Sequence, residues 1–244
     1  MRTGLLAIGL LTLVPAAGRA DDAATVVERA VTATAGSDIR LRRLDAVVRT
    51  ERGSFFQPAG ELPTRRIAYL ALPDRIKYDA TITVGGQPQS VVLAVDGVHG
   101  WKRMTGVIQD MASAEYDSVK TDLDDWSLIT LLPLRRKDAT LKSLPAATVG
   151  GKPAAAVSVT RPSRPDAQLY FAADTGLLVR VRFKLPEAGP NATRDVDLGE
   201  YREFDGIKLP TRIIVTRNGK KTEEWTVEGY QTPDRLDDKA FKKP

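Results

Sequence analysis

Residues 193–230 read TRDVDLGEYREF-DG-IKLPTRIIVTR-NG-KKTEEWTVEGY, and this stretch decides the fold. Asp205-Gly206 and Asn218-Gly219 are strong hairpin signals, because both dipeptides accept the positive backbone dihedrals of tight turns. The stretch therefore predicts three antiparallel strands joined by two short turns.

Alternation of apolar and polar residues extends this pattern through most of the chain. Gly85-Gly86, Asp96-Gly97 and Asp174-Thr175-Gly176 supply further turns. We predict additional strands over 44–50, 65–72, 75–82, 90–95, 98–103, 155–161, 168–172 and 179–185. We interpret 54–63 as a loop and 137–153 as a connector.

Two segments carry a helical spacing instead. Asp21 or Asp22 caps a predicted helix over 24–34, which Gly36 ends. Between 111 and 134 apolar residues recur every three or four positions, which predicts one or two helices.

The second helical segment ends at Pro133. Asp122 is its expected cap, with Asp124 and Asp125 in the first turn, where carboxylates complement the helix dipole. The acidic stretch that these residues form with Asp117 lacks the pattern of a calcium loop, so a solvated helix start is preferred over a cation site.

These elements predict an α+β fold in one domain, residues 21–244. Short strands at regular spacing favour a strongly curved antiparallel sheet or half-open β-barrel of about nine to eleven strands. Such a sheet has a concave face that needs covering, so we expect the N-terminal helix and the helical insertion to cover it.

The N-terminus predicts export. Arg2 precedes an apolar run over 4–14 and small residues up to Ala20, which is the layout of a signal peptide spanning 1–20. Cleavage is expected near Ala20, with cleavage after Gly18 as a rival and an uncleaved anchor as the less favoured alternative. The predicted location is the periplasm.

Composition limits the chemistry of the chain. It has 244 residues, no cysteine, a formal net charge of +5 and a pI near 9.4. An exported chain without cysteine has no disulfides and must be stabilised by its core. Because 36 basic residues face 31 acidic ones and no dense basic run occurs, nucleic-acid binding is not expected.

Four segments carry a resemblance to a known family. They are PDRIKY at 73–78, VDGVHGW at 95–101, YFAADTGLL at 170–178 and YREFDGIKLP at 201–210. In this order, behind an exported helix, they resemble the outer-membrane lipoprotein-sorting family, the LolA-like periplasmic carriers and their uncharacterised relatives. The resemblance covers most of the mature chain.

The resemblance implies a half-open barrel whose hydrophobic inner face lies under a lid of helices. In such carriers the cavity takes up acyl chains of lipoproteins, and an early-strand arginine holds the lid. Arg43 and Arg49 both fall near the first predicted strand, and no local motif chooses between them.

Apolar side chains on the predicted inner face and lid are the candidate ligand-binding residues. The lid is expected over 124–132, where one stripe of apolar residues would plug the open side. An ordinary filled core is the alternative interpretation. The candidates are Tyr78, Trp101, Leu123, Trp126, Ile129, Leu132, Ile213, Val215, Trp225 and Val227.

Catalytic, metal-binding and cofactor motifs are missing from the sequence. His99 is the only histidine, and we interpret it as a loop residue because it has no nucleophile or second ligand at a useful spacing. We therefore expect that the protein is not an enzyme and binds neither a cofactor nor a metal ion. A lipid or glycan hydrolase that depends on His99 is the weakest hypothesis.

The leading hypothesis is a monomeric, non-enzymatic periplasmic carrier or sensor of a hydrophobic ligand. The expected ligand is an acyl chain of a lipid or lipoprotein. The alternative is an envelope interaction module with a filled core and no lipid cargo, whose protein partner could meet Arg180, Arg182 and Lys184. The preferred interpretation of these three residues is a solvated strand face.

Overall fold

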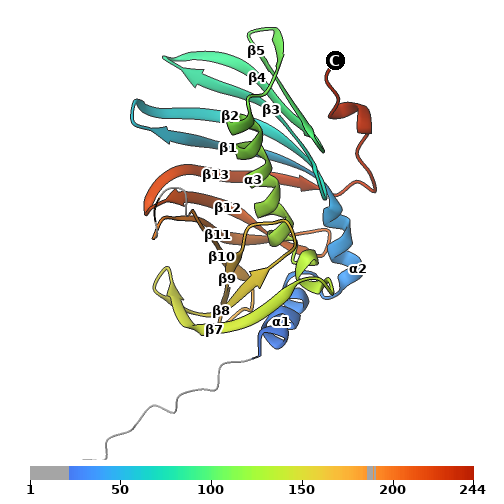
Figure 1. The fold of residues 1–244 in the computed structure, drawn as a ribbon, viewed down its shortest axis with the longest axis vertical. Helices are drawn as coiled ribbons and strands as arrows, with labels where there is room; N and C mark the ends of the chain where they lie inside the picture. The colour runs from blue at the N-terminus through green and yellow to red at the C-terminus, as the bar shows by residue number, and fades with distance from the viewer. Residues whose placement is uncertain (1–21, 186–188, 190) are drawn as a thin grey trace, which may run out of the picture.

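Thirteen antiparallel strands form one sheet in the computed structural model, which describes residues 22–185, 189 and 191–244 (Figure 1). The predicted signal peptide, residues 1–20, lies outside these described residues. The strands are β1 (Ala46–Gln57), β2 (Gly60–Ala71), β3 (Arg75–Val84), β4 (Gln87–Asp96), β5 (His99–Met104), β6 (Val107–Asp110), β7 (Thr140–Val149), β8 (Lys152–Thr160), β9 (Ala167–Ala172), β10 (Leu178–Lys184), β11 (Thr193–Phe204), β12 (Ile207–Arg217) and β13 (Lys220–Gln231).

The sheet consists of two meanders that meet where β1 pairs with β13. The strand order is β6-β5-β4-β3-β2-β1-β13-β12-β11-β10-β9-β8-β7. Within the described residues β6 and β7 are the two edges and do not pair, so the curved sheet stays unclosed. The predicted α+β class with a half-open barrel is therefore confirmed, although the sheet has thirteen strands in the described residues and not the nine to eleven predicted.

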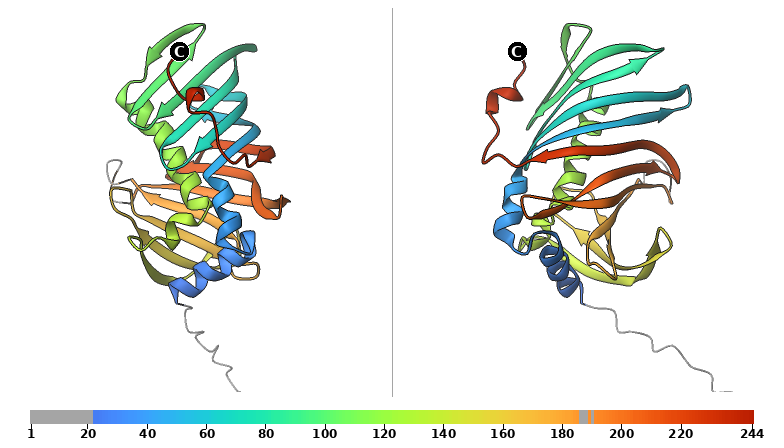
Figure 2. Two further views of the ribbon diagram at one scale, coloured as in Figure 1. Left: turned by 90° about the vertical axis from the view of Figure 1, so that its right-hand side faces the viewer. Right: turned by 180° about the vertical axis from the view of Figure 1, so that it is seen from behind.

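Apart from η4, which belongs to the C-terminal segment, the helices lie on the concave side and at one end of the sheet (Figures 1 and 2). Because β6 and β7 are opposite edges, the chain between them has to cross the sheet, and α3 makes most of this crossing. No helix in the described part of the chain is long and apolar enough to span a bilayer. The helices are α1 (Ala23–Ala35), α2 (Asp38–Leu41), η1 (Arg42–Asp45), α3 (Ser113–Ile129), η2 (Leu132–Arg135) and η4 (Asp238–Ala240).

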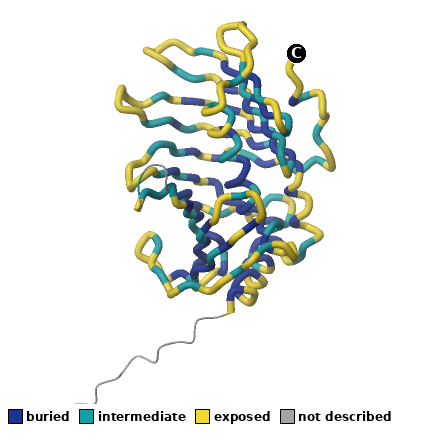
Figure 3. The backbone as a smooth tube through the Cα atoms, in the orientation of Figure 1, coloured by how far each residue is buried: buried dark blue, intermediate teal, exposed yellow. Residues whose placement is uncertain are grey.

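The core fills the space between the helices and the concave face. Figure 3 shows buried residues concentrated along the middle of the strands and exposed residues at the hairpin tips. One large apolar cluster joins α1 and α3 to strands of both meanders, and its members include Val27, Ala30, Leu123, Trp126, Leu169, Phe171, Leu209 and Trp225. The sheet and its helical cover therefore form one hydrophobic unit.

The turns that predicted the C-terminal meander have the expected backbone. Asp205 and Gly206 have φ of 50° and 78°, and Asn218 and Gly219 have φ of 52° and 75°. Both central residues of each turn are left-handed, which matches the twist of the flanking strands.

Two segments that the sequence analysis assigned to loops are strands. Residues 54–63 form the β1–β2 hairpin, in which the ring of Phe55 packs edge-on against Trp225 with centroids 5.1 Å apart. Residues 137–153 contain β7, an edge strand in which no residue is buried. An edge strand buries little on either face, so it lacks the alternation that reveals inner strands.

The predicted start of the lid helix was wrong. Helix α3 begins at Ser113, and the Glu115 carboxylate accepts a hydrogen bond from the Ala112 backbone N–H at 3.0 Å. Asp122, Asp124 and Asp125 are therefore interior helix residues and not a solvated helix start. Their charges are balanced by Arg194 of β11 and by Arg164 of the loop between β8 and β9.

The outward arginines of β10 are paired with their neighbours on β11. Arg180 donates to both carboxylate oxygens of Asp197, and Arg182 donates to both oxygens of Asp195. These cross-strand pairs give the strand face a structural role.

Candidate functional site

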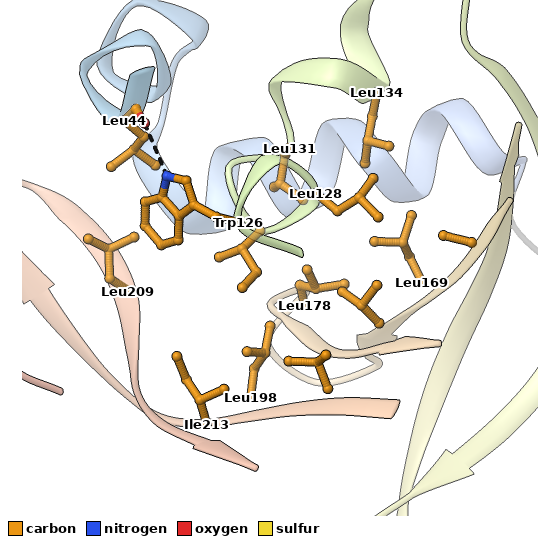
Figure 4. Packing of buried hydrophobic residues seen from close by; sticks show 14 of the residues in the cluster. Leu44, Trp126, Leu128, Leu131, Leu134, Leu169, Leu178, Leu198, Leu209 and Ile213 are labelled. Atoms are coloured by element: carbon orange, nitrogen blue, oxygen red, sulfur yellow. Dashed lines mark hydrogen bonds between the residues drawn. The ribbon is translucent and has the colours of Figure 1, made fainter. Parts of the chain in front are cut away.

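Helix α3 presents both apolar and acidic side chains to the concave face. Trp126 stands at the centre of this face, 1% exposed, and its Nε1 donates to the Leu44 carbonyl at 3.3 Å (Figure 4). Its ring stacks on Tyr230 of β13, with centroids 6.1 Å apart. This tryptophan therefore ties α3 to the middle of the sheet.

Arg194 of β11 is the main ionic anchor of α3. The residue is 1% exposed, and its Nη1 donates to Asp125 Oδ1 at 2.6 Å. Its Nη2 reaches Asp122 Oδ1 at 3.4 Å. Asp122 also accepts from the Tyr78 hydroxyl of β3 at 3.0 Å, so this carboxylate links α3 to both halves of the sheet.

A second buried charge cluster lies beside this anchor, on β1 and β2. Glu51 is 1% exposed and accepts a hydrogen bond from Arg66 Nε at 2.6 Å. Arg49 Nε lies 2.8 Å from the other oxygen of Glu51, as an ion pair without the direction of a hydrogen bond. Two guanidinium groups thus share one carboxylate.

The same arginines stack on the aromatic rings of the interior. The Arg66 guanidinium carbon lies 3.6 Å from the Trp225 ring centroid and 4.2 Å from that of Tyr78. Arg49 lies 5.0 Å from the Trp126 ring on α3. Desolvated cation–π contacts of this kind contribute about 2 kcal/mol each.

Burial and charge shift the pKa of the acids in opposite directions. Burial alone would raise the pKa of Glu51, but Arg49 and Arg66 outweigh it and lower the pKa. Burial raises the pKa of Asp125 to about 7, and Arg194 opposes the rise only in part. Burial together with Asp122 also raises the pKa of Glu223 on β13.

The space enclosed by these groups is small. A void of about 30 Å³ remains, which is the room of a water molecule or so. In this conformation the interior is filled, and its lining is mixed polar and apolar. The lining residues are Arg49, Arg66, Tyr78, Asp122, Asp125, Trp126, Ile129, Arg194, Val196, Ile213, Val215, Glu223 and Trp225.

Most of the residues proposed from sequence as ligand-binding gather around this void. Leu123 and Val227 are buried in the surrounding core without lining it, and Leu132 lies in a separate cleft beyond the end of α3. The six that line the void are Tyr78, Trp126, Ile129, Ile213, Val215 and Trp225.

Trp101 lies on the opposite, outer face of the sheet. It packs with Val92 and Ala94, and its Nε1 donates to the Phe241 carbonyl at 2.7 Å. Residues 232–244, here called the C-terminal tail, cover it there. The strand register explains the difference, because Ala94 and Val95 are neighbours on β4 and only Val95 joins the main core.

Arg49 was named only through the family resemblance, Asp122 and Asp125 only as a helix start, and the other charged members of the site were not recognised from sequence. Arg49 and Glu51 share strand parity with the buried Val47, and Arg194 shares it with Val196. The sequence signal that could have revealed them is a charged residue at a strand position whose neighbours two residues away are apolar and face inward. Buried charges need partners, so this parity indicates a polar interior.

Of the two early arginines, Arg49 contacts the lid helix. Arg43 lies in η1, where it donates to Asp205 and Thr232 near the surface. Arg49 is 5% exposed and faces Trp126 of α3.

His99 is exposed at the start of β5, and no group of acids, histidines or cysteines in the described residues is placed to hold a metal ion.

Solved structures similar to this chain share its fold across nearly its whole length. A LolA superfamily protein from Nitrosomonas europaea superposes with a TM-score of 0.60 at 15% identity, over 92% of this chain and 99% of its own. A putative outer membrane lipoprotein-sorting protein domain from Vibrio parahaemolyticus superposes with a TM-score of 0.55 at 9% identity, over 90% of this chain and 97% of its own. A DUF1329 family protein from Desulfovibrio piger superposes with a TM-score of 0.55 at 13% identity, over 91% of this chain and 98% of its own.

Sequence comparison adds no further relative. No family profile and no curated protein matches the chain. At these identities the structural likeness concerns the fold alone. The chain has the LolA-like fold, as its sequence resemblance predicted.

Proposed function

We propose that the protein is a periplasmic, non-enzymatic carrier of a hydrophobic ligand, an acyl chain of a lipid or lipoprotein. The ligand would bind between the concave face and α3 after α3 moves outward. The observation that supports this is a helix that crosses the open side of the sheet on discrete polar anchors, with apolar wall residues behind it. The Vibrio protein of the same fold is described as a putative lipoprotein-sorting domain, which agrees with this proposal.

The anchors lie along the whole length of α3. At its start, Glu115 pairs with Lys102, and the Tyr116 hydroxyl donates to the Gly97 carbonyl at 2.7 Å. At its end, Leu131 has a φ of 62°, a conformation that costs a non-glycine residue roughly 1–2 kcal/mol. Strained backbone of this kind clusters at switch segments, so we infer that α3 would turn about this residue, two positions beyond its last residue Ile129.

The energies allow an acyl chain to displace the helix. About twelve buried methylenes contribute roughly 10 kcal/mol. Hydrogen bonds to charged groups contribute about 1.5–3 kcal/mol each in net terms. The burial of one acyl chain can thus offset the loss of the hydrogen bonds that Arg194 and Tyr78 make to α3. This holds if Trp126, Ile213 and Trp225, which lose their packing when α3 moves, pack against the acyl chain instead.

A fluorescent fatty-acyl probe tests the proposal. We expect saturable binding and lipid that co-purifies with the protein, detected by mass spectrometry. The Tyr78→Phe variant keeps the ring but removes the hydrogen bond to Asp122, so it should tighten apparent binding by up to about tenfold through a larger open fraction. Tyr201→Phe is the matched control, because its hydroxyl donates to Leu178 on β10 and not to α3.

Two results would contradict the proposal. Absence of both co-purifying lipid and probe binding would remove the carrier function. Amide exchange across 121–129 as slow as in the central strands, with and without lipid, would remove the moving helix.

An envelope interaction module is the second candidate, and the filled interior favours it. A void of about 30 Å³ holds no ligand without rearrangement. The edge strand β6 is exposed at every residue, including Val107 at 62%, and offers free backbone groups for a partner strand. Capture of one envelope protein that is lost when β6 is changed, without acyl binding, would support this candidate.

A further inference from the structure

A cleft of about 670 Å³ lies beyond the end of α3, separate from the void beneath it. Its walls come from α2 and η1, from the β2–β3 turn, from η2 and from the loop between β8 and β9. No residue lines both the cleft and the void. Its volume falls within the range of small-molecule sites.

Cations outnumber anions on the cleft wall, with five arginines and three aspartates. Three of the arginines have partners. Arg136 binds Asp138 at 3.1 Å, and Arg164 binds Asp124 at 2.5 Å. Arg135 pairs with Asp38 at 3.3 Å and also with Glu28 of α1.

The fourth arginine, Arg42, is exposed and interacts electrostatically with Asp45, so Arg161 is the exception among these cations. It is only 9% exposed, yet neither its Nε nor its Nη2 has a hydrogen-bond partner among the described residues. The carboxylate that interacts with it electrostatically is that of Asp124, which already accepts a hydrogen bond from Arg164. Burial lowers the pKa of Arg161, which is the sign of a desolvated guanidinium without enough counter-charge.

Arg161 lines the cleft, but its unpartnered Nε and Nη2 are closed off from solvent, and such a buried cation is costly. A ligand in the cleft would lower this cost by supplying counter-charge, and acceptors once the guanidinium turns toward it. We propose that this cleft binds the phosphate group of an anionic ester, with Arg161 as the residue that contacts it directly. Arg42, an exposed residue of η1 on the cleft wall, is placed to contribute a second guanidinium. The site shares no lining residue with the void of the acyl-binding space proposed above, although Ser127 and the Arg164–Asp124 pair connect it to α3.

The arrangement favours phosphate over carboxylate. One guanidinium fork satisfies both oxygens of a carboxylate, whereas a phosphate offers three or four oxygens that several forks can share. The cleft is also larger than inorganic phosphate needs, and Leu72, Leu132 and Pro133 give it apolar walls. Those walls suit an organic substituent on the phosphate.

Calorimetric titration of the full-length mature chain tests the site with three probes. Inorganic phosphate, glycerol 3-phosphate and dihexanoyl phosphatidic acid share the phosphate but differ in their substituent. Binding of the lipid alone identifies a headgroup, and similar binding of all three identifies a free phosphate ester. Both results support the proposal.

Arg161→Gln should weaken binding by about tenfold or more, because it removes a charge-assisted contact. Arg42→Gln should weaken it by a smaller factor, and this exposed position keeps the test valid if the buried variant folds poorly. Arg103→Gln, an exposed arginine on β5 outside the cleft, is the control and should bind as the wild type does.

A stability measurement separates ligand binding from a structural role. Without ligand, Arg161→Gln should melt at the wild-type temperature or above, because it removes an unpaired buried charge. The proposal is overturned if no probe binds at millimolar concentration, if hexanoate binds as tightly as the phosphate probes, or if Arg161→Gln binds all probes as the wild type does. Titration of the acyl probe should be unchanged in this variant, so failure of either proposal leaves the other standing.

Discussion

Replacing Arg194 by methionine is the sharpest test of how α3 is held on the sheet. The change keeps the length and apolar stem of the side chain but removes the guanidinium that binds Asp125 at 2.6 Å. Asp125 then remains buried on α3, with Asp122 and Glu223 as acidic neighbours. The variant therefore isolates the ionic part of the contact.

The expected loss of stability is about 3–5 kcal/mol at a pH where Asp125 is ionised, the range for breaking a buried ion pair. In a chain of this size each kcal/mol lowers the melting temperature by about 2–4 °C. Replacing both partners, as in Arg194→Met with Asp125→Leu, should recover most of the loss, because no buried charge is left unpaired.

The pH dependence has a defined sign. Burial raises the pKa of Asp125 from 3.8 to about 7, so the folded state binds this proton more tightly than the unfolded state does. Stability from this group is complete below pH 3.8 and is lost as the pH rises through about 7. Without Arg194 the pKa rises further, so the variant should be weakened more at about pH 8.5 than at about pH 5.5.

Urea unfolding at these two pH values, followed by tryptophan fluorescence, measures the effect. Arg180→Met is the matched control, because Arg180 makes a two-pronged pair with Asp197 on the more exposed outer face. Its loss should be smaller, about 1–2 kcal/mol, because both side chains stay partly exposed to water. A loss in Arg194→Met no larger than in this control, or one that does not grow with pH, would refute the account of α3 as ionically anchored.

Two further predictions concern the sheet and the C-terminal tail. Gly53→Ala should lower the free energy of unfolding, measured in urea, by about 2 kcal/mol or more, because the new Cβ would stand 2.1 Å from the Glu224 carbonyl oxygen. Gly229→Ala is the control and should cost less than about 1 kcal/mol, because the space around its Cβ is open. Equal losses in the two variants would contradict the packing argument. Trp101→Phe removes the hydrogen bond to the Phe241 carbonyl and should speed tryptic cleavage of the C-terminal tail; an unchanged rate would show that this bond does not hold the tail.

Local patterns predicted the strands that have one buried face and the turns between them. Asp205-Gly206 and Asn218-Gly219 specify their hairpins through backbone preferences of two residues. The same logic failed at β7, which buries no residue, and at the start of α3, whose first turns are too polar to reveal an inner face. Weak burial leaves weak periodicity, so such elements need the rest of the sheet to be recognised.

The candidate site was half predictable. Trp126, Ile213 and Trp225 were recognisable as inward apolar residues because strand and helix periods place them on one face. Arg194 and Asp125 were not, because a charge becomes a site member only when its partner, 69 positions away in sequence, is brought to 2.6 Å. A local sequence pattern cannot indicate a contact between residues so far apart in the chain.

By itself the sequence determined a meander of antiparallel strands, an N-terminal helix and a helical insertion, because alternation and turn chemistry act between near neighbours. Only the tertiary structure decided that β1 pairs with β13, that α3 crosses from one sheet edge to the other, and that the interior beneath it is charged and nearly full. It also placed Trp101 outside and, among the described residues, left two donors of Arg161 without a partner in its cleft. These features depend on contacts between distant segments, which form only when the whole sheet curves around its helix.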